Sequence, residues 1–233
     1  MTKSGLTSAE QFVLYAIEIG ALELVPEGRA LKSGRISPYF FNSGLFNDGE
    51  SLGVLANAYA STIFERFTDD VMEPTFNILY GPPYKGTILA PAISLCLSMF
   101  ETFDTSFCTS RKEAKEHGEK GTLIGAPILA GSRVLLIDDV ITDGGTKREA
   151  VEFIRGYGGE LGGLVIAFDR QERSGDGKFS AAQEFEFEYG VPVCAVATFT
   201  DLISVLQKMP SASGDPDGVM FDKIKAYCSQ YGV

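Results

Sequence analysis

The stretch RVLLIDDVITDGGTKR, residues 133–148, predicts a strand, a turn and a helix in that order. Residues 134–137 are apolar without alternation, which is typical of a strand that is covered on both faces. Asp138 and Asp139 follow directly, and a turn over residues 142–146 leads into a helical pattern. Because ligands bind beyond the carboxyl ends of the strands in open α/β sheets, this stretch predicts both the fold class and the position of a site.

The residue types in this turn suit a phosphorylated sugar. N–H groups at a helix start bind phosphate, and Gly144 and Gly145 let the backbone approach it closely. Asp138 and Asp139 would repel a phosphate, but they can accept hydrogen bonds from sugar hydroxyls or hold a hydrated metal. A solvated turn is the simpler alternative. The buried strand before the pair argues against it, because two half-buried charges are costly without partners.

Length and composition limit the classes of function. A chain of 233 residues can bury a full core, and we expect one domain over residues 1–233. A formal net charge of -11 argues against a nucleic-acid partner, because phosphate neutralisation needs clustered cations. Four scattered cysteines and one histidine favour reduced thiols in a cytoplasmic protein over disulfides or a metal finger. No run approaches the roughly 18 apolar residues of a membrane span, and residues 1–11 lack a secretory apolar core.

Strand and helix patterns alternate along the chain, which predicts an α/β fold with a central, mostly parallel sheet flanked by helices. The expected strands are 76–80, 134–137, 161–168 and 193–197, and the expected helices are 11–19, 48–67, 87–100, 147–155, 181–189, 201–207 and 219–231.

Two cationic side chains and three aromatic rings lie close together in LKSGR (31–35) and SPYFFN (37–42). One interpretation is a β-hairpin whose rings join the core, because aromatic residues are usually core material. However, adjacent Phe40 and Phe41 cannot both point to one face of a strand. One ring could therefore stack on a planar ligand, with Lys32 nearby.

A second strand, turn and helix pattern surrounds GPPYKG, residues 81–86. Pro82 and Pro83 bar regular hydrogen bonding, so the chain itself imposes the shape of this loop. Lys85 stands before a helix start and could receive a second phosphate group, although a proline turn is often only a turn.

The most polar stretch is SRKEAKEHGEKG, residues 110–121, which holds the only histidine, His117. Pairs such as Lys112 and Glu116 can interact at i,i+4, which favours a solvated surface helix. Glycines at 118 and 121 and the apolar segments on either side equally favour a lid that closes on a substrate.

The motifs resemble the orotate phosphoribosyltransferases, a family of type I phosphoribosyltransferases. The resemblance rests on LKSGR, SPYFFN, GPPYKG, RKEAKEHG, VLLIDDVIT and DRQER, in this order and over roughly residues 10–175. It implies a type I phosphoribosyltransferase-like fold in which residues 1–45 and the C-terminal segment form a small hood. It also implies transfer of the 5-phosphoribosyl group from 5-phosphoribosyl-1-pyrophosphate (PRPP) to orotate. The products are orotidine 5′-monophosphate and pyrophosphate, in pyrimidine biosynthesis.

The resemblance also implies roles for individual residues. Lys115, Asp138 and Asp139 would be catalytic, and Mg²⁺ would be held through PRPP and waters without a certain protein ligand. A lid carrying Lys115 would serve the partner's active site in a homodimer. Orotate would lie among Lys32, Phe40, Phe41, Thr142 and Arg170. PRPP would meet Lys32, Tyr84, Lys85, Arg111, Lys112, Lys115, His117, Asp138, Asp139, Val140, Ile141, Thr142, Asp143, Gly144, Gly145 and Thr146.

One departure concerns the phosphate turn, where Asp143 adds a negative charge that we expect to point away from the phosphate. The Gly-Gly-Thr order that follows resembles purine-using relatives, so a phosphoribosyltransferase for another nucleobase is one rival. A PRPP-sensing regulator that binds nucleic acid is a second rival, which the acidic balance disfavours. Because only about 30 residues follow residue 200, far fewer than the roughly 250 of a typical barrel, we expect no fused decarboxylase barrel. By similarity to relatives, the Pro83–Tyr84 peptide is expected to be cis.

Overall fold

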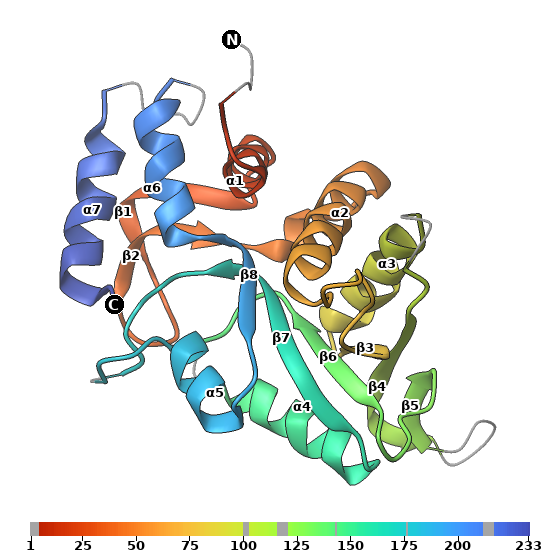
Figure 1. Cartoon of the computed structure of the whole chain (residues 1–233). Helices are drawn as coiled ribbons and strands as arrows, with labels where there is room; N and C mark the ends of the chain where they lie inside the picture. Colours follow the sequence, from red (N-terminus) through yellow and green to blue (C-terminus); the bar gives the residue numbers. More distant parts are fainter. Residues whose placement is uncertain (1–4, 100–102, 116–120, 143, 176, 212–216) are drawn as a thin grey trace.

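The structure is a computed structural model that describes residues 5–99, 103–115, 121–142, 144–175, 177–211 and 217–233. Within this part of the chain the central sheet has six strands in the order β5-β4-β3-β6-β7-β8 (Figure 1). Every neighbouring pair is parallel except β4 and β5, so the predicted mostly parallel sheet is confirmed. The strands are β3 (Ile78–Gly81), β4 (Ser106–Lys115), β5 (Gly121–Gly125), β6 (Arg133–Asp138), β7 (Glu160–Asp169) and β8 (Val193–Thr198).

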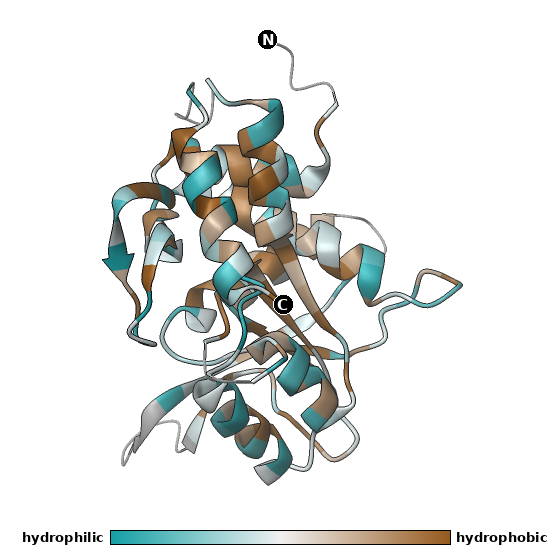
Figure 2. Cartoon of the chain, turned by 90° about the vertical axis from the view of Figure 1, so that its left-hand side faces the viewer, coloured by the Kyte–Doolittle hydropathy of each residue, from teal (hydrophilic) through white to brown (hydrophobic). Residues whose placement is uncertain are grey.

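Both faces of the sheet are covered, as the apolar run of β6 predicts. Leu135 and Ile137 join one hydrophobic cluster, while Val134 and Leu136 join the cluster on the opposite face. Figure 2 shows the apolar strands between helices whose outer surfaces are more polar. The first face carries α1 (Ser8–Glu18), α2 (Gly49–Arg66) and α3 (Gly86–Met99), and the second carries α4 (Gly145–Gly156) and α5 (Ala181–Tyr189) (Figure 1).

A small antiparallel sheet lies apart from the central sheet (Figure 1). It consists of β1 (Leu22–Ala30) and β2 (Ile36–Phe41), which pair from Leu22 opposite Phe41 to Ala30 opposite Ile36. Helix α7 (Val219–Tyr231) packs on β2, and α6 (Phe199–Lys208) packs on α1 and α7. The N-terminal elements α1 and β2 therefore lie beside the C-terminal helices α6 and α7.

The surface-helix interpretation is wrong for residues 110–115. These residues belong to β4, where Ser110 pairs with Leu123 and Lys115 pairs with Gly121 of β5. Pairing with β5 outweighs the local i,i+4 preference, because strand formation depends on tertiary context. His117 lies outside the described residues.

Among the described residues, none of the helices combines the length and the apolar character that crossing a bilayer requires.

Candidate active site

The two predicted aspartates lie where β6 ends. Asp138 is the last residue of the strand, and the buried Tyr59 of α2 donates a hydrogen bond of 2.6 Å to its backbone carbonyl. Asp138 Oδ1 accepts a bond of 2.9 Å from the N–H of Asp139. The strand end is thus fixed from both sides, and it presents two carboxylates with different partners.

Asp138 is paired with a lysine that the sequence analysis did not single out. Lys147, in the first turn of α4, places its Nζ 2.6 Å from Asp138 Oδ2, and both side chains are about 10% exposed or less. Burial raises the pKa of Asp138 even though the Lys147 ammonium opposes this effect. A lysine five residues beyond Thr142 reads as an ordinary polar residue of an amphipathic helix. Only its burial against Asp138 distinguishes it.

Asp139 has a different environment. Its Oδ2 accepts hydrogen bonds from Lys85 Nζ at 2.8 Å and from Ser43 Oγ at 2.7 Å. Burial acts to raise the pKa of Asp139, but the bonds from Lys85 and Ser43 lower it on balance. The result is an ionised acceptor beside a half-exposed cation. Ser43 begins the short 3₁₀ helix η1 (Ser43–Leu45) that follows β2.

The glycine turn has a backbone conformation that favours glycine. Gly144 is left-handed, with φ of 75°, and stands at the N-cap of α4. A side chain there would be strained, and its Cβ would lie 3.0 Å from an Arg148 nitrogen. Around it, Thr142 and Thr146 are exposed, Val140 and Gly145 half-buried and Ile141 buried. Asp143, whose orientation was predicted, lies outside the described residues.

The loop GPPYKG places Lys85 against Asp139. Its Pro83–Tyr84 peptide is cis, as predicted. Its two ends touch, since a Cβ on Gly81 would lie 1.9 Å from the carbonyl oxygen of Gly86. Thr109 of β4 donates a hydrogen bond of 2.7 Å to the Gly81 carbonyl. Tyr84 is exposed at the tip.

The predicted base-binding rings separate onto two faces of β2. Phe41 is buried and stacks on Phe168 at a centroid distance of 5.4 Å, so it belongs to the core. Phe40 is half-buried on the other face, with the Arg29 guanidinium 4.2 Å from its ring centroid. Lys32 is exposed in the turn between β1 and β2.

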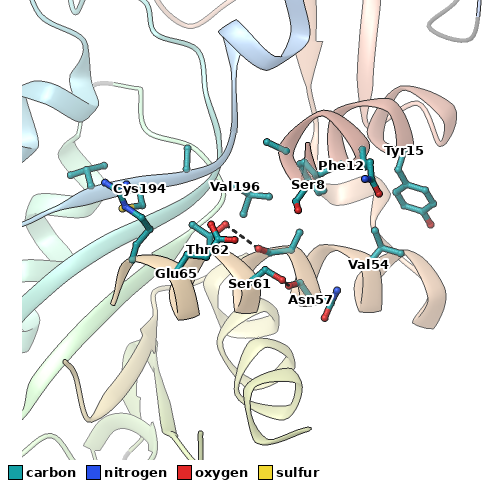
Figure 3. Close-up of a pocket in the computed structure, with 16 residues that line it drawn as sticks. Ser8, Phe12, Tyr15, Val54, Asn57, Ser61, Thr62, Glu65, Cys194 and Val196 are labelled. Atoms are coloured by element: carbon teal, nitrogen blue, oxygen red, sulfur yellow. Dashed lines mark hydrogen bonds between the residues drawn. The ribbon is translucent and has the colours of Figure 1, made fainter. Parts of the chain in front are cut away.

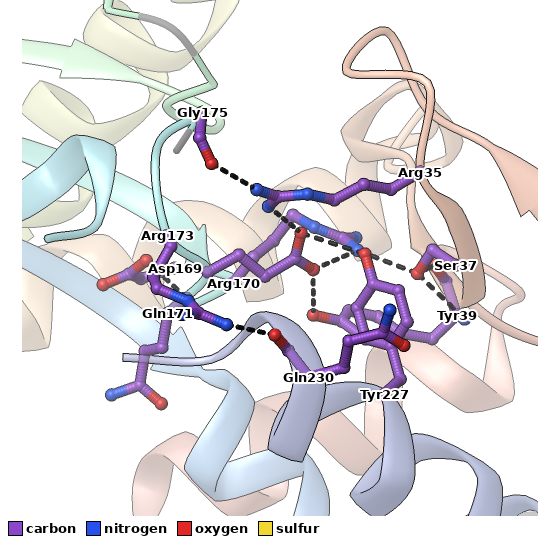
Figure 4. Close-up of polar contacts among 11 residues, drawn as sticks. Arg35, Ser37, Tyr39, Asp169, Arg170, Gln171, Arg173, Gly175, Tyr227 and Gln230 are labelled. Carbon is purple, nitrogen blue, oxygen red and sulfur yellow. Dashed lines mark hydrogen bonds and ion pairs between the residues drawn. The ribbon is translucent and has the colours of Figure 1, made fainter. Parts of the chain in front are cut away.

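Arg170 lies in a buried polar cluster that joins the hairpin to the segment after β7 (Figure 4). Its Nη2 donates to Ser37 Oγ at 2.8 Å and to Glu172 Oε1 at 2.5 Å. Its guanidinium carbon lies 4.2 Å from the centre of the Tyr39 ring. The sequence analysis missed Glu172, although the motif DRQER contains it.

Of the predicted lid residues, Arg111 is half-buried in β4, and Lys112 and Lys115 are placed by the backbone of that strand. The described residues thus bring Asp138, Asp139 and Lys85 together and set Arg170 in a separate cluster.

A groove of about 670 Å³ lies elsewhere, between α1, α2 and β8 (Figure 3). Phe12, Asn57, Thr62 and Cys194 are among its lining residues, and none of the predicted site residues lines it. We place the candidate active site at the strand ends, because the paired carboxylates and cations gather there.

Comparison with known proteins gives a consistent family. The Phosphoribosyl transferase domain family matches residues 49–194, more than half of the chain. A curated orotate phosphoribosyltransferase of Thioalkalivibrio sulfidiphilus is 44% identical over 227 residues, which cover 97% of this chain and 99% of that protein.

Two solved structures are also similar. The orotate phosphoribosyltransferase of Francisella tularensis is 34% identical, with a TM-score of 0.81 over 96% of this chain and 100% of that one. The Mycobacterium tuberculosis orotate phosphoribosyltransferase in complex with PRPP is 18% identical, with a TM-score of 0.60 over 84% of this chain and 99% of that one. The second match supports the fold alone.

Proposed function

Since this chain belongs to the orotate phosphoribosyltransferases, we propose how its residues divide the work of that reaction. The enzyme transfers the 5-phosphoribosyl group from PRPP to orotate in pyrimidine biosynthesis. The single observation that carries the assignment of roles is the arrangement at the end of β6. There, Asp138 and Asp139 lie beside a glycine turn, and each is already bound to its own lysine.

Asp138 and Asp139 face the ribose and accept hydrogen bonds from its hydroxyl groups. Breaking the bond between C1 and pyrophosphate puts positive charge on the sugar and negative charge on the leaving group. A carboxylate near the ribose stabilises the first charge, and Lys85 and Lys115 stabilise the second. Lys85 is half exposed at 46%, so it can turn from Asp139 towards pyrophosphate at little cost in solvation. The backbone from Thr142 to Thr146 receives the 5′-phosphate.

Mg²⁺ fits this site as a companion of PRPP. Among the described residues, no three His, Cys, Asp or Glu side chains are grouped to hold a metal. Asp138 and Asp139 are oxygen donors of the kind Mg²⁺ prefers, but both are engaged by lysines. The ion would therefore be held through PRPP oxygens and waters, where it neutralises charge on the leaving pyrophosphate.

Orotate lies on the side of the hairpin. Arg170 provides a cation for the anionic base, and Phe40, on the less buried face of β2, provides a ring for stacking. Lys32 and Thr142 complete the border of the site. Phe41 supports the base site from the core, because its ring stacks on Phe168. The hairpin and the C-terminal segment form the hood of one domain over residues 1–233.

A homodimer with a shared lid completes the assembly. Tyr84 and three residues of α3 (Ile88, Leu95 and Met99) are exposed apolar side chains at helical spacing. We assign this face to the dimer contact, because it continues directly from the loop that holds Lys85. The lid then carries Arg111, Lys112, Lys115 and His117 to the partner's site. Free thiols at all four cysteines agree with a cytoplasmic location.

Orotate consumption with PRPP and Mg²⁺ tests the reaction, with uracil and adenine assayed in parallel. We expect turnover of orotate alone. Lys115→Ala should lower kcat by roughly 10²- to 10³-fold, as loss of one transition-state cation or donor does. Lys178→Ala, an exposed lysine of the loop before α5, is the matched control and should keep full activity. Turnover of adenine instead of orotate would favour the other-nucleobase rival, and PRPP binding without any turnover would favour the regulator.

A further inference from the structure

We propose that Glu172 is a positioning residue that fixes Arg170 for orotate and links the base site to the C-terminal helix α7. The inference rests on the proposed function, in which Arg170 contacts the base. It goes further by giving Glu172 and Tyr227 a role in base affinity. These two residues do not themselves contact orotate in this proposal.

Four donors converge on the Glu172 carboxylate, whose side chain is 11% exposed (Figure 4). Oε1 accepts from Arg170 Nη2 at 2.5 Å and from Tyr39 Oη at 3.1 Å. Oε2 accepts from Tyr227 Oη at 3.0 Å and from Arg35 Nη1 at 3.5 Å. The donors come from the hairpin, the segment after β7 and α7, so one side chain joins three parts of the chain that are distant in sequence.

The tyrosine hydroxyls are stable donors in this cluster. Burial, followed by the nearby Glu172 charge, raises the pKa of Tyr227 to about 12. Burial likewise raises the pKa of Tyr39 well above its ordinary value. Both hydroxyls therefore stay protonated at neutral pH and point their hydrogens at Glu172.

Two guanidinium groups contact the single carboxylate of Glu172. They belong to Arg35 and Arg170, and both side chains are about 15% exposed or less. Arg170 Nε is buried and has no hydrogen-bond partner among the described residues. Arg170 therefore keeps an unused donor for an anionic ligand. The negative charge of Glu172 offsets the positive charge of the buried Arg170 guanidinium and so holds this side chain in position before the anion binds.

Fixing Arg170 in advance improves binding, because a long side chain otherwise loses torsional freedom when it meets its ligand. Arg170 is clamped between Glu172 and the face of Tyr39. The backbone of its segment is also tied to the C-terminus, since Arg173 N donates to the Tyr231 carbonyl at 2.8 Å and Val233 N donates to the Gln171 carbonyl at 3.1 Å. Movement of α7 should therefore change base affinity.

Steady-state kinetics of Glu172→Gln test this inference. Gln keeps the size and one acceptor of Glu172 but removes the charge that holds Arg170. We expect KM for orotate to rise about 10-fold or more, with KM for PRPP within about 2-fold of wild type. Tyr227→Phe removes one hydrogen bond from α7 and should raise KM for orotate by a few-fold. Glu152→Gln is the matched control, because Glu152 pairs with Arg155 at 3.1 Å on the exposed side of α4 and should change neither KM.

A purely structural role for Glu172 would raise both KM values together or lower kcat alone, and either result overturns the inference. If circular dichroism shows that Glu172→Gln does not fold, Tyr227→Phe provides the test. The same result is then required, a raised KM for orotate with an unchanged KM for PRPP. Arg170→Lys separates this inference from the proposed function. An unchanged orotate KM in Arg170→Lys removes Arg170 from the base site. If KM for orotate rises in Arg170→Lys but is unchanged in Glu172→Gln, the positioning role of Glu172 is refuted while Arg170 stays in the base site.

Discussion

The sugar side of the active site, around Asp138 and Asp139, and the base side, around Arg170, carry charges of opposite sign. On each side the charged groups are paired with side chains of the other sign. On the sugar side two carboxylates are held by lysines, Asp138 by Lys147 and Asp139 by Lys85. On the base side two arginines, Arg35 and Arg170, are held by one carboxylate. In both places the charged side chain that we assign to ligand binding is paired with another side chain of the protein, so binding exchanges partners and does not bury a bare ion.

The two sides differ in how the chain builds them. Asp138, Asp139 and Lys147 lie within one strand, turn and helix, and Lys85 adds a single long-range contact. The base side joins residues 133 positions apart, since Arg170 donates to Ser37. The sugar side is therefore a local motif, whereas the base side exists only after the hairpin and α7 have docked. Changes on one side should leave the affinity of the other intact, and the variants Asp139→Asn, Lys147→Met and Phe40→Ala probe the two sides.

Asp139→Asn should produce the largest of these three effects. The amide keeps the shape but loses the charge that accepts ribose hydroxyls and holds Lys85. Loss of a charged hydrogen bond is worth about 1.5–3 kcal/mol, so kcat/KM for PRPP should fall roughly 10- to 100-fold. Measured under the same conditions, KM for orotate should stay constant. Asp222→Asn, at an exposed position of α7, is the control. A similar rise in KM for orotate would contradict the independence of the sugar side and the base side.

Lys147→Met should have the next largest effect and should depend on pH. Burial already raises the pKa of Asp138, and removing the Lys147 ammonium, which opposes this effect, should raise it further. The acid limb of kcat/KM for PRPP should then move to higher pH. Lys85→Met is the matched variant, and its acid limb should move less because Lys85 is half exposed. Equal shifts in the two variants would contradict a special role for the buried pair.

The same variant makes a prediction for stability. A carboxyl whose folded-state pKa is raised favours folding while protonated, and this contribution is lost as pH rises through the raised value. The deficit in unfolding free energy of Lys147→Met should therefore be smallest below the ordinary pKa of 3.8 and widen at higher pH. At neutral pH it should reach about 3–5 kcal/mol, as for a broken buried pair, in urea denaturation. A deficit independent of pH would show that lost packing dominates.

Phe40→Ala should have the smallest effect on activity. The half-buried ring is expected to stack on orotate, so KM for orotate should rise about 5-fold, equivalent to ~1 kcal/mol. Phe41→Ala is the comparison within the base side. Its buried ring stacks on Phe168, and its loss should lower the unfolding free energy by about 3–5 kcal/mol, well above the loss for Phe40→Ala. Reversal of this order would exchange the roles of the two rings.

The sequence predicted the features that lie within short stretches. The β6 strand, the glycine turn before α4 and the cis peptide at Pro83–Tyr84 all follow from local patterns or from resemblance, and the structure has each of them. The surface-helix interpretation was wrong for residues 110–115 because i,i+4 spacing does not reveal strand pairing with β5. Lys147 and Glu172 were missed because each sits in a motif that was assigned to other residues.

By itself the sequence determined the strands β3, β6, β7 and β8, the helices α1 to α7, the acidic pair at the end of β6 and the family to which the chain belongs. The physical reason is that apolar periodicity and turn residues act over a few positions. Only the tertiary structure decided which charges meet, because Lys85 reaches Asp139 from another strand's loop and four donors reach Glu172 from distant segments. A charge is stabilised by its neighbours in space, and those neighbours are set by packing, which no single stretch of sequence encodes.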